Sequence, residues 1–415
     1  MLSPALLASR FARFLLICLA LCVSLAARAA DMVYFNDGRV LIGEIIKETD
    51  DEVEAKGTID GVAMHSTFKR SQIASLIKDT KKKPTSIIKT DPKDEESKGD
   101  FLIVPLKGEF GTDIYPLGVI NAMDWCVKNK VPQIVFVIDS PGGYVWAAEY
   151  MAEKMAEKDA ALKFTMVIDS AISASIWPAF ASDRWFVTPA AIFGGAVVYS
   201  VSDTGAAEVD TKMNSILAAK VGAMAESNGH SAALARAMML PGSPAFAVQK
   251  DGRWIITDDG RGGSDGAVSL NKNGIITLTA QECLRYGIAA QIPDSSTASI
   301  AAALGENKKS AGDAGEVAMR NAKTSCDGLL RRWKTFNENI ARRVDDLNET
   351  ASTATDKEAV IRKIDAVAST ITNGFGPIRD DARKLHMLPL FARLENADIK
   401  KYSERINEIK KRIRK

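Results

Sequence analysis

The sequence predicts an α/β fold built on a parallel sheet, because one stretch of the chain repeats a strand–turn–helix unit. A β-branched apolar run at 134–138 has the composition of a buried strand, and a Pro-Gly-Gly turn at 141–143 follows it. Apolar residues then recur at helical spacing over 145–155. A second strand at 164–168 leads into a run of small residues that opens another helix. Such repeats predict parallel strands joined by right-handed crossovers.

Length and composition limit the number of domains and the kinds of partner and metal site to expect. A chain of 415 residues exceeds what a single core usually holds, so we expect two or three domains. The net charge of +2 gives no argument for a nucleic-acid partner. Beyond residue 29 the cysteines are Cys126, Cys283 and Cys326, with no Cys-x-x-Cys pair. We therefore expect neither a disulfide scaffold nor a standard zinc site, and no cofactor.

Residues 1–29 have the pattern of a secretory signal peptide. Arg10 and Arg13 precede an apolar run at 14–26, and Ala27-Arg28-Ala29 supplies small residues for cleavage. We expect the mature protein to start near Ala30 and to work in the periplasm or outside the cell. The alternative is an uncleaved N-terminal anchor.

Residues 30–78 predict a small β domain. Asn36-Asp37-Gly38 is a hairpin signal between two β-rich runs, and further short alternating segments follow. This pattern favours a small barrel of SH3-like or Sm-like type with a binding role, and His65 is expected on its surface. Residues 79–100 are charged and almost free of apolar residues, which is typical of a linker.

The chemistry is concentrated where the second strand meets its helix. Ser170, Ser173 and Ser175 lie there among small residues. A serine at a helix start places its hydroxyl beside unpaired backbone amides, and the amides of a preceding glycine turn can face the same point. Together such groups can hold an oxyanion, which favours acyl chemistry.

This stretch resembles the ClpP/crotonase superfamily, and within it most closely the NfeD-type membrane-associated serine peptidases and signal peptide peptidase A. The resemblance covers about half the chain and implies a ββα superhelix for a protease domain at 101–300. In those families an acid, a proline and a glycine follow the nucleophile. These markers match Asp183, Pro189 and Gly194, and aligning the chain on them places the nucleophile at Ser173.

The resemblance also implies the remaining roles. The turn at Gly142 and Gly143, with the amide of Ala174, would form the oxyanion hole. The NfeD-type peptidases carry a D-x-K-x-x-N segment whose lysine is the general base, and here that lysine is Lys212, although Asn214 lies one position early. An amine can act as a base when burial lowers its pKa, as in a Ser-Lys dyad.

Several alternatives stay open at this point. Lys220, about two helical turns after Lys212, is the rival base. No histidine lies between Ser173 and His230, so a ClpP-type histidine base is not expected, and we expect His230 on the surface. Ser175 occupies a position that is usually glycine in the family, where its side chain could narrow the cleft or add a hydroxyl to it.

Residues 301–415 predict a coiled-coil-like helical hairpin or bundle. Apolar residues recur at three- and four-residue steps after Glu316. A second helix at 356–371 is expected to end at the glycines and proline of 374–377, and a third to start near Ala397. The basic end of this third helix suits an anionic envelope surface, or simply complements its own helix dipole.

Taken together, the sequence predicts a secreted or periplasmic serine endopeptidase with a Ser173–Lys212 dyad. Its expected substrate is a peptide or an unfolded protein segment, and its expected form is a homo-oligomer with peripheral association to the envelope. The alternative is an inactive Clp-fold scaffold. An acyl-CoA enzyme of the crotonase branch is disfavoured by the leader, because CoA thioesters are cytosolic.

Overall fold

A computed structural model describes most of the chain. The chain divides into two compact units, one before residue 92 and one from residue 92 onward. The described residues are 31–35, 40–49, 51–59, 62–77, 98–157, 161–201, 207–209, 211–261, 266–271, 274–353 and 355–414. The expected leader and residues 79–97 of the expected linker lie outside them.

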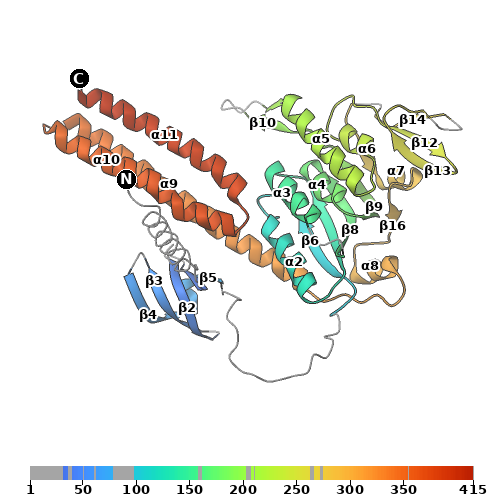
Figure 1. The fold of residues 1–415 in the computed structure, drawn as a ribbon, viewed down its shortest axis with the longest axis horizontal. Coiled ribbons are helices and arrows are strands. Elements are labelled where there is room, and N and C mark those ends of the chain that lie inside the picture. The colour runs from blue at the N-terminus through green and yellow to red at the C-terminus, as the bar shows by residue number, and fades with distance from the viewer. Residues whose placement is uncertain are drawn as a thin grey trace, which may run out of the picture. The chain divides into compact units, whose positions relative to one another are not determined.

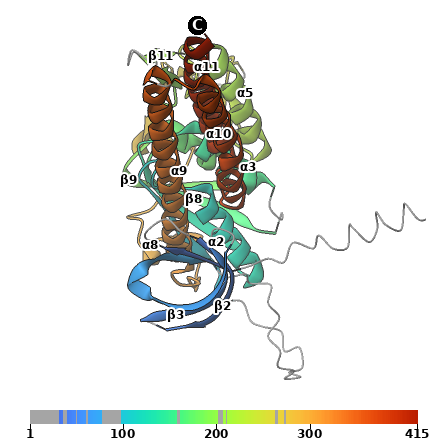
Figure 2. The ribbon, with the colours of Figure 1, turned by 90° about the vertical axis from the view of Figure 1, so that its left-hand side faces the viewer.

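The first unit is an antiparallel β domain. Its strands are β1 (Asp31–Phe35), β2 (Val40–Glu48), β3 (Glu52–Ile59), β4 (Val62–Lys69) and β5 (Ile73–Ile77), in the order β4-β3-β2-β1-β5. The sheet curves strongly (Figure 2), and Val33, Leu41 and Ala55 form its core. His65 is exposed on β4, as expected, with its Nε2 2.9 Å from Glu54 Oε1.

The second unit is organised around one sheet, in which six described strands take part. Four of them lie parallel in chain order: β6 (Leu102–Lys107), β7 (Gln133–Ser140), β8 (Lys163–Ile172) and β9 (Arg184–Gly194). The crossovers contain α2 (Pro116–Lys128), α3 (Val145–Ala156) and α4 (Ile176–Phe180). β15 (Thr277–Thr279) and β16 (Ala290–Gln291) pair with β9. The predicted strand–turn–helix repeat is confirmed.

The continuous apolar run of β7 follows from burial on both faces. Ile134, Phe136 and Ile138 point into the main core beneath α2 and α3. Val135 and Val137 point to the other face, where they join a smaller cluster that includes residues of α8 (Thr297–Leu304). A strand covered on both faces cannot alternate apolar with polar residues.

The rest of the central region follows β9 in the chain. It comprises β10 (Tyr199–Val201), β11 (Ala207–Val209), α5 (Thr211–Ser227), α6 (Ala232–Ala237), β12 (Phe246–Lys250), β13 (Arg253–Thr257), β14 (Val268–Ser269) and α7 (Ala280–Arg285). β10 and β11 pair with each other, and β12 lies between β13 and β14.

Three long helices follow: α9 (Ala314–Thr353), α10 (Lys357–Lys384) and α11 (Leu388–Arg414) (Figure 1). Two expected boundaries are wrong, because α10 continues through Gly374, Gly376 and Pro377, and α11 begins nine residues before Ala397. A methyl group at Gly374 would lie 2.5 Å from the ring of Phe336 on α9. This glycine therefore permits close helix packing, which outweighs its low helix propensity.

The helix α9 belongs both to the core of the main sheet and to the helical region that follows it. Met319, Ala322 and Cys326, on the first half of α9, belong to the same core as the main sheet. The second half of α9 packs with α10 and α11 around a separate cluster that includes Ile364 and Phe375.

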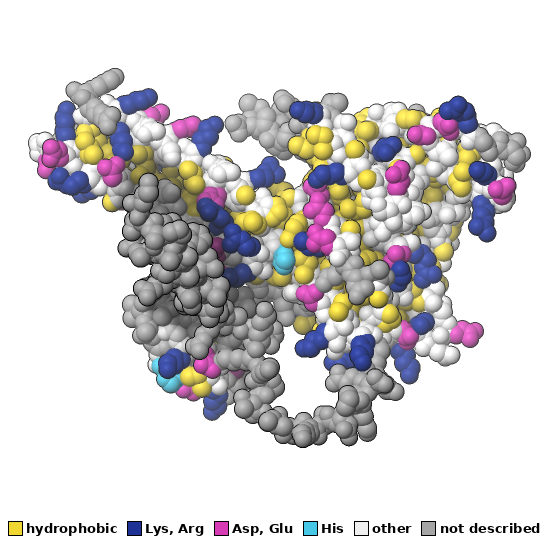
Figure 3. All heavy atoms as spheres, viewed as in Figure 1, with side chains coloured by type: hydrophobic (Ala, Val, Ile, Leu, Met, Phe, Trp, Pro, Cys, Tyr) yellow, Lys and Arg dark blue, Asp and Glu magenta, His cyan; other side chains and the backbone are white. Residues whose placement is uncertain are grey.

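Charges on this bundle are mixed in sign. In the face drawn in Figure 3, basic and acidic side chains are interspersed over α9–α11. Lys410, near the basic end, pairs with Asp365 on α10 at 2.9 Å. The basic end of α11 is thus partly neutralised within the bundle.

Cys126, Cys283 and Cys326 are free thiols in buried positions, and burial raises the pKa of each to about 12. In the part of the chain that the structure describes, no helix has both the length and the apolar character to cross a membrane.

Candidate active site

The candidate site lies at the carboxyl ends of β7 and β8. These strands are parallel neighbours that end at Ser140 and Ile172, so the glycine turn and Ser173 come out at the same edge of the sheet. In open α/β sheets this edge is where ligands bind.

Ser173 lies directly against Gly142. A methyl group at Gly142 would lie 2.5 Å from Ser173 Cβ and 3.0 Å from its Oγ, so only glycine fits there. Ser173 itself has φ +57°, in the left-handed region that residues with a Cβ seldom adopt. Strained residues of this kind cluster at functional sites, where the surrounding structure holds them in place.

Gly143 is held by the loop that follows β6. The Phe110 N–H donates to the Gly142 carbonyl at 2.8 Å, and the Tyr144 N–H donates to the Phe110 carbonyl at 2.9 Å. Phe110 thus bonds to the carbonyl of Gly142 and to the N–H of Tyr144, the two residues that flank Gly143. In such a parallel pairing the N–H of the middle residue, Gly143, points to the side away from Phe110. A methyl group at Gly143 would lie 2.5 Å from both Phe110 N and O.

The three amides expected to hold an oxyanion are not equivalent. The Gly142 N–H donates to Ser140 Oγ at 3.1 Å and is therefore engaged within its own turn. Ala174 is the second residue of a short 3-10 helix, η2 (Ser173–Ser175), and the first amides of a helix have no acceptor inside it. Gly143 and Ala174 are therefore better placed than Gly142 to donate to a ligand.

Ser175 faces the interior. It is fully buried, and its hydroxyl donates to the Ser140 carbonyl at 3.3 Å. It therefore neither adds a hydroxyl to the site nor narrows it. Its contact joins η2 to the end of β7, and with it the two segments that carry Ser173 and the glycine turn.

The markers that follow Ser173 have structural roles. Asp183 accepts a hydrogen bond from the Phe164 N–H at 2.7 Å and so connects the end of α4 to the start of β8. Pro189 lies inside β9, which continues to Gly194. Gly194 has φ +130° and lies against the Ile276 carbonyl.

Asn214 ties the first turn of α5 to the same end of the sheet. Its Oδ1 accepts from the Val198 N–H at 2.8 Å, and its Nδ2 donates to the Val198 carbonyl at 2.6 Å. Val198 lies four residues after Gly194, which pairs with Ile172 in β8. Lys212, two residues before Asn214, is exposed.

Lys220 is engaged elsewhere. Its Nζ lies 2.5 Å from Glu149 Oε1 and 4.0 Å from Glu153 Oε1, both on α3. The hydrogen bond to Glu149 raises the pKa of Lys220, so its amine stays protonated. This rival base instead connects α5 to α3.

His230 is not the surface residue that was expected. Its ring stacks on Trp185 with centroids 3.9 Å apart, and Nε2 donates to the Ser182 carbonyl at 2.7 Å. Burial lowers the pKa of His230. The ring thus joins the α5–α6 connection to the corner between α4 and β9.

His386, at the α10–α11 connection, also has a lowered pKa, caused first by burial and then by Lys154. Both folded-state pKa values lie below the unfolded value of about 6.5, so the unfolded chain binds more protons in acid. We expect the free energy of unfolding to fall as the pH drops below about 6.5. The His230→Gln and His386→Gln variants should each weaken this pH dependence in urea titrations, and unchanged slopes in both would contradict the assignment.

Within the described ranges, no cluster of three His, Cys, Asp or Glu residues could bind a metal ion.

Four parallel strands in chain order with helical crossovers carry a serine beside a glycine turn at their carboxyl ends, which is the arrangement that the resemblance to the ClpP/crotonase superfamily implies. Residues 102–253 match the family model of the NfeD1b N-terminal domain. This match confirms the resemblance to the NfeD-type branch for that part of the chain.

Solved structures give weaker likenesses. Two variants of the 1510-N membrane-bound stomatin-specific protease, one in complex with a substrate peptide, are 17% and 16% identical, each with a TM-score of 0.36. These matches cover 48% and 49% of this chain, and 83% and 80% of theirs. The 1510-N membrane protease specific for a stomatin homolog from Pyrococcus horikoshii is 15% identical at a TM-score of 0.30, over 47% of this chain and 74% of its own. No curated protein matches the chain.

Proposed function

We propose that this chain is a serine endopeptidase of the NfeD type that works in the periplasm or outside the cell. The observation that carries the proposal is the position of Ser173, in a left-handed conformation against Gly142 at the carboxyl ends of β7 and β8. Residues with a Cβ seldom adopt this conformation, and those that do cluster at functional sites, which supports a functional role for a serine that also lies against a glycine turn.

In the proposed reaction, Ser173 Oγ attacks the carbonyl carbon of a peptide bond while Lys212 Nζ takes the hydroxyl proton. The amides of Gly143 and Ala174 donate to the oxyanion, and Gly142 leaves room for the nucleophile. The amine product leaves with the proton returned by Lys212, and water then hydrolyses the acyl-enzyme.

Lys212 must be neutral to accept a proton, and its exposed position does not by itself provide the desolvation that favours the neutral form. We propose that the bound substrate covers this part of α5. Met213 and Ile216, which are 45% and 46% exposed beside it, offer apolar surface for that contact.

The substrate that suits such a site is an extended peptide or an unfolded protein segment. We also propose a homo-oligomer with peripheral association to the cell envelope. The second candidate function is an inactive Clp-fold scaffold, and the exposure of Lys212 is the observation that favours it.

A fluorophosphonate probe separates the two functions, because it reacts covalently with an activated serine and needs no known substrate. We expect labelling of the folded full chain, with the adduct mapped by mass spectrometry to Ser173. A folded chain that is not labelled would support the scaffold.

The base is tested by replacing the two lysines of α5. We expect Lys212→Ala and Lys212→Arg each to lower the labelling rate by about 10²-fold or more, since a guanidinium cannot accept the proton. Lys220→Ala, which removes an exposed ion pair, should have a mild effect. The wild-type rate should rise with pH without a histidine limb near about 6.5. Loss of labelling in Lys220→Ala alone would reassign the base.

A further inference from the structure

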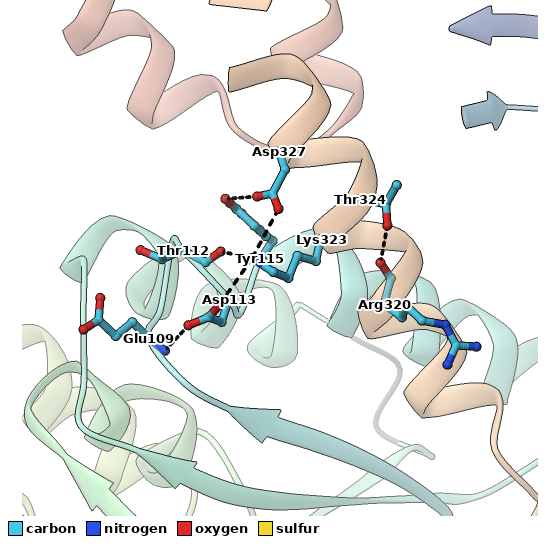
Figure 4. A network of polar contacts seen from close by, with 8 residues as sticks. All are labelled: Glu109, Thr112, Asp113, Tyr115, Arg320, Lys323, Thr324 and Asp327. Atoms are coloured by element: carbon cyan, nitrogen blue, oxygen red, sulfur yellow. Dashed lines mark hydrogen bonds and ion pairs between the residues drawn. The ribbon is translucent and has the colours of Figure 1, made fainter. Parts of the chain in front are cut away.

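One loop connects the candidate oxyanion turn to the C-terminal helices. This loop, residues 108–114, joins β6 to α2, and its Phe110 pairs with the backbone on both sides of Gly143. On its other side the loop contacts α9, more than 200 residues later in the chain. Figure 4 shows the polar contacts between them.

Lys323 of α9 is the centre of these contacts. Its Nζ donates to the Thr112 carbonyl at 2.8 Å and lies 3.3 Å from Asp113 Oδ1 and 3.2 Å from Asp327 Oδ2. Burial disfavours the ammonium, but hydrogen bonds to Asp327 and Asp113 more than offset it and raise the pKa of Lys323. The side chain therefore stays charged, with acceptors on both elements.

Each carboxylate also binds a second group. The other oxygen of Asp113 accepts from the Glu109 N–H at 3.1 Å, one residue before Phe110. Asp327 accepts from the Tyr115 hydroxyl at 2.9 Å, one residue after the loop. The contacts with α9 thus reach both ends of the loop and the residue next to Phe110.

α9 itself is firmly seated at this point. A methyl group at Gly315 would overlap the Ile103 carbonyl oxygen of β6, and one at Gly118 of α2 would lie 2.5 Å from Met319 Sδ. Two glycines thus let α9 pack in direct contact with β6 and α2. Close-packed contacts of this kind leave little room for the helix to shift, so it can act as a fixed support.

We propose that Lys323 is a positioning residue for the active site. By fastening the 108–114 loop to α9, it holds Phe110 where Phe110 orients Gly143, and so directs the Gly143 amide toward the developing oxyanion. This inference rests on the proposed serine peptidase function. It adds that the helical region is required for the geometry of the site.

The effect on rate should exceed the effect on stability. Ion pairs as exposed as this one contribute little to folding. Stabilisation of an oxyanion instead depends on donors held within fractions of an ångström, and small displacements of such groups lower rates by large factors. A purely structural role for Lys323 would not give this difference.

The test compares Lys323→Met, which keeps most of the side-chain length and removes the charge, with Lys308→Met in the full chain. Lys308 is a matched control, because it also joins distant segments, with its Nζ 2.9 Å from Asp100 Oδ1 and a side chain 42% exposed against 41% for Lys323. We expect Lys323→Met to lower the fluorophosphonate labelling rate about tenfold and to speed hydrogen exchange of the Phe110 and Tyr144 amides. Lys308→Met should change neither, and Lys323→Arg should restore most of both.

The outcomes are distinct. An unlabelled wild-type chain would overturn the proposed function, and this inference with it. A labelled wild type whose Lys323→Met variant keeps wild-type labelling or wild-type exchange at Phe110 and Tyr144 would overturn the inference alone. Equal losses in Lys308→Met would show a general loss of stability and would likewise overturn it.

Discussion

The Ser173→Ala variant is expected to lose fluorophosphonate labelling and peptide turnover to background, a fall of at least about 10³-fold. In the proposed reaction Ser173 Oγ is the only group that forms a covalent bond with the substrate. The fold should survive, because alanine at φ +57° has about the same backbone strain as serine. Labelling, turnover and thermal unfolding should be measured on the same samples.

The neighbouring serine provides the control. Ser175→Ala removes a buried hydrogen bond to the Ser140 carbonyl and should cost about 1 kcal/mol of stability. Its labelling at 25 °C should remain within a few fold of wild type. If Ser173→Ala is still labelled while Ser175→Ala is not, the nucleophile has been assigned to the wrong serine.

Alanine in the glycine turn should have the second largest effect. At Gly142 the added methyl group would lie 2.5 Å from Ser173 Cβ, and at Gly143 it would lie 2.5 Å from the Phe110 backbone. One change displaces the nucleophile, and the other displaces the amide that we assign to the oxyanion. We expect each to lower the labelling rate by about 10²-fold or more and to cost about 1–3 kcal/mol of stability.

The Gly305→Ala variant is the control that separates the effect of steric contact in the glycine turn from the effect of backbone strain. Gly305 has φ +133°, close to the +130° of Gly143, but no atom lies within 4 Å of the site of the added methyl group. It should therefore have a similar backbone strain and keep its labelling. Equal loss of labelling in Gly305→Ala would mean that global destabilisation, not the geometry of the turn, explains the result.

The sequence by itself determined the strands, the glycine turn and the serine segment, and also the edge of the sheet at which the turn and the serine lie. The apolar run at 134–138, the Pro-Gly-Gly turn and the serine segment each depend on local properties: β-branched burial, glycine at positive φ, and small residues at a helix start. Parallel strands then bring the turn and Ser173 together without further information, because their carboxyl ends share one edge.

Only the tertiary structure decided what the neighbouring polar residues do. The sequence left the roles of Ser175 and Lys220 open and predicted a surface position for His230. In the structure Ser175 contacts Ser140, Lys220 pairs with Glu149, and His230 stacks on Trp185. Those partners lie 35 to 71 residues away in the chain, so no local pattern could reveal them.

The helical region illustrates the same limit. Local propensity ends a helix near Gly374 and Pro377, but packing of Gly374 against Phe336 carries α10 onward. The contact of Lys323 with Thr112 joins residues 211 positions apart. Spacing and propensity describe neighbours in the chain, whereas these contacts form only once the sheet has brought α2, α9 and the 108–114 loop together.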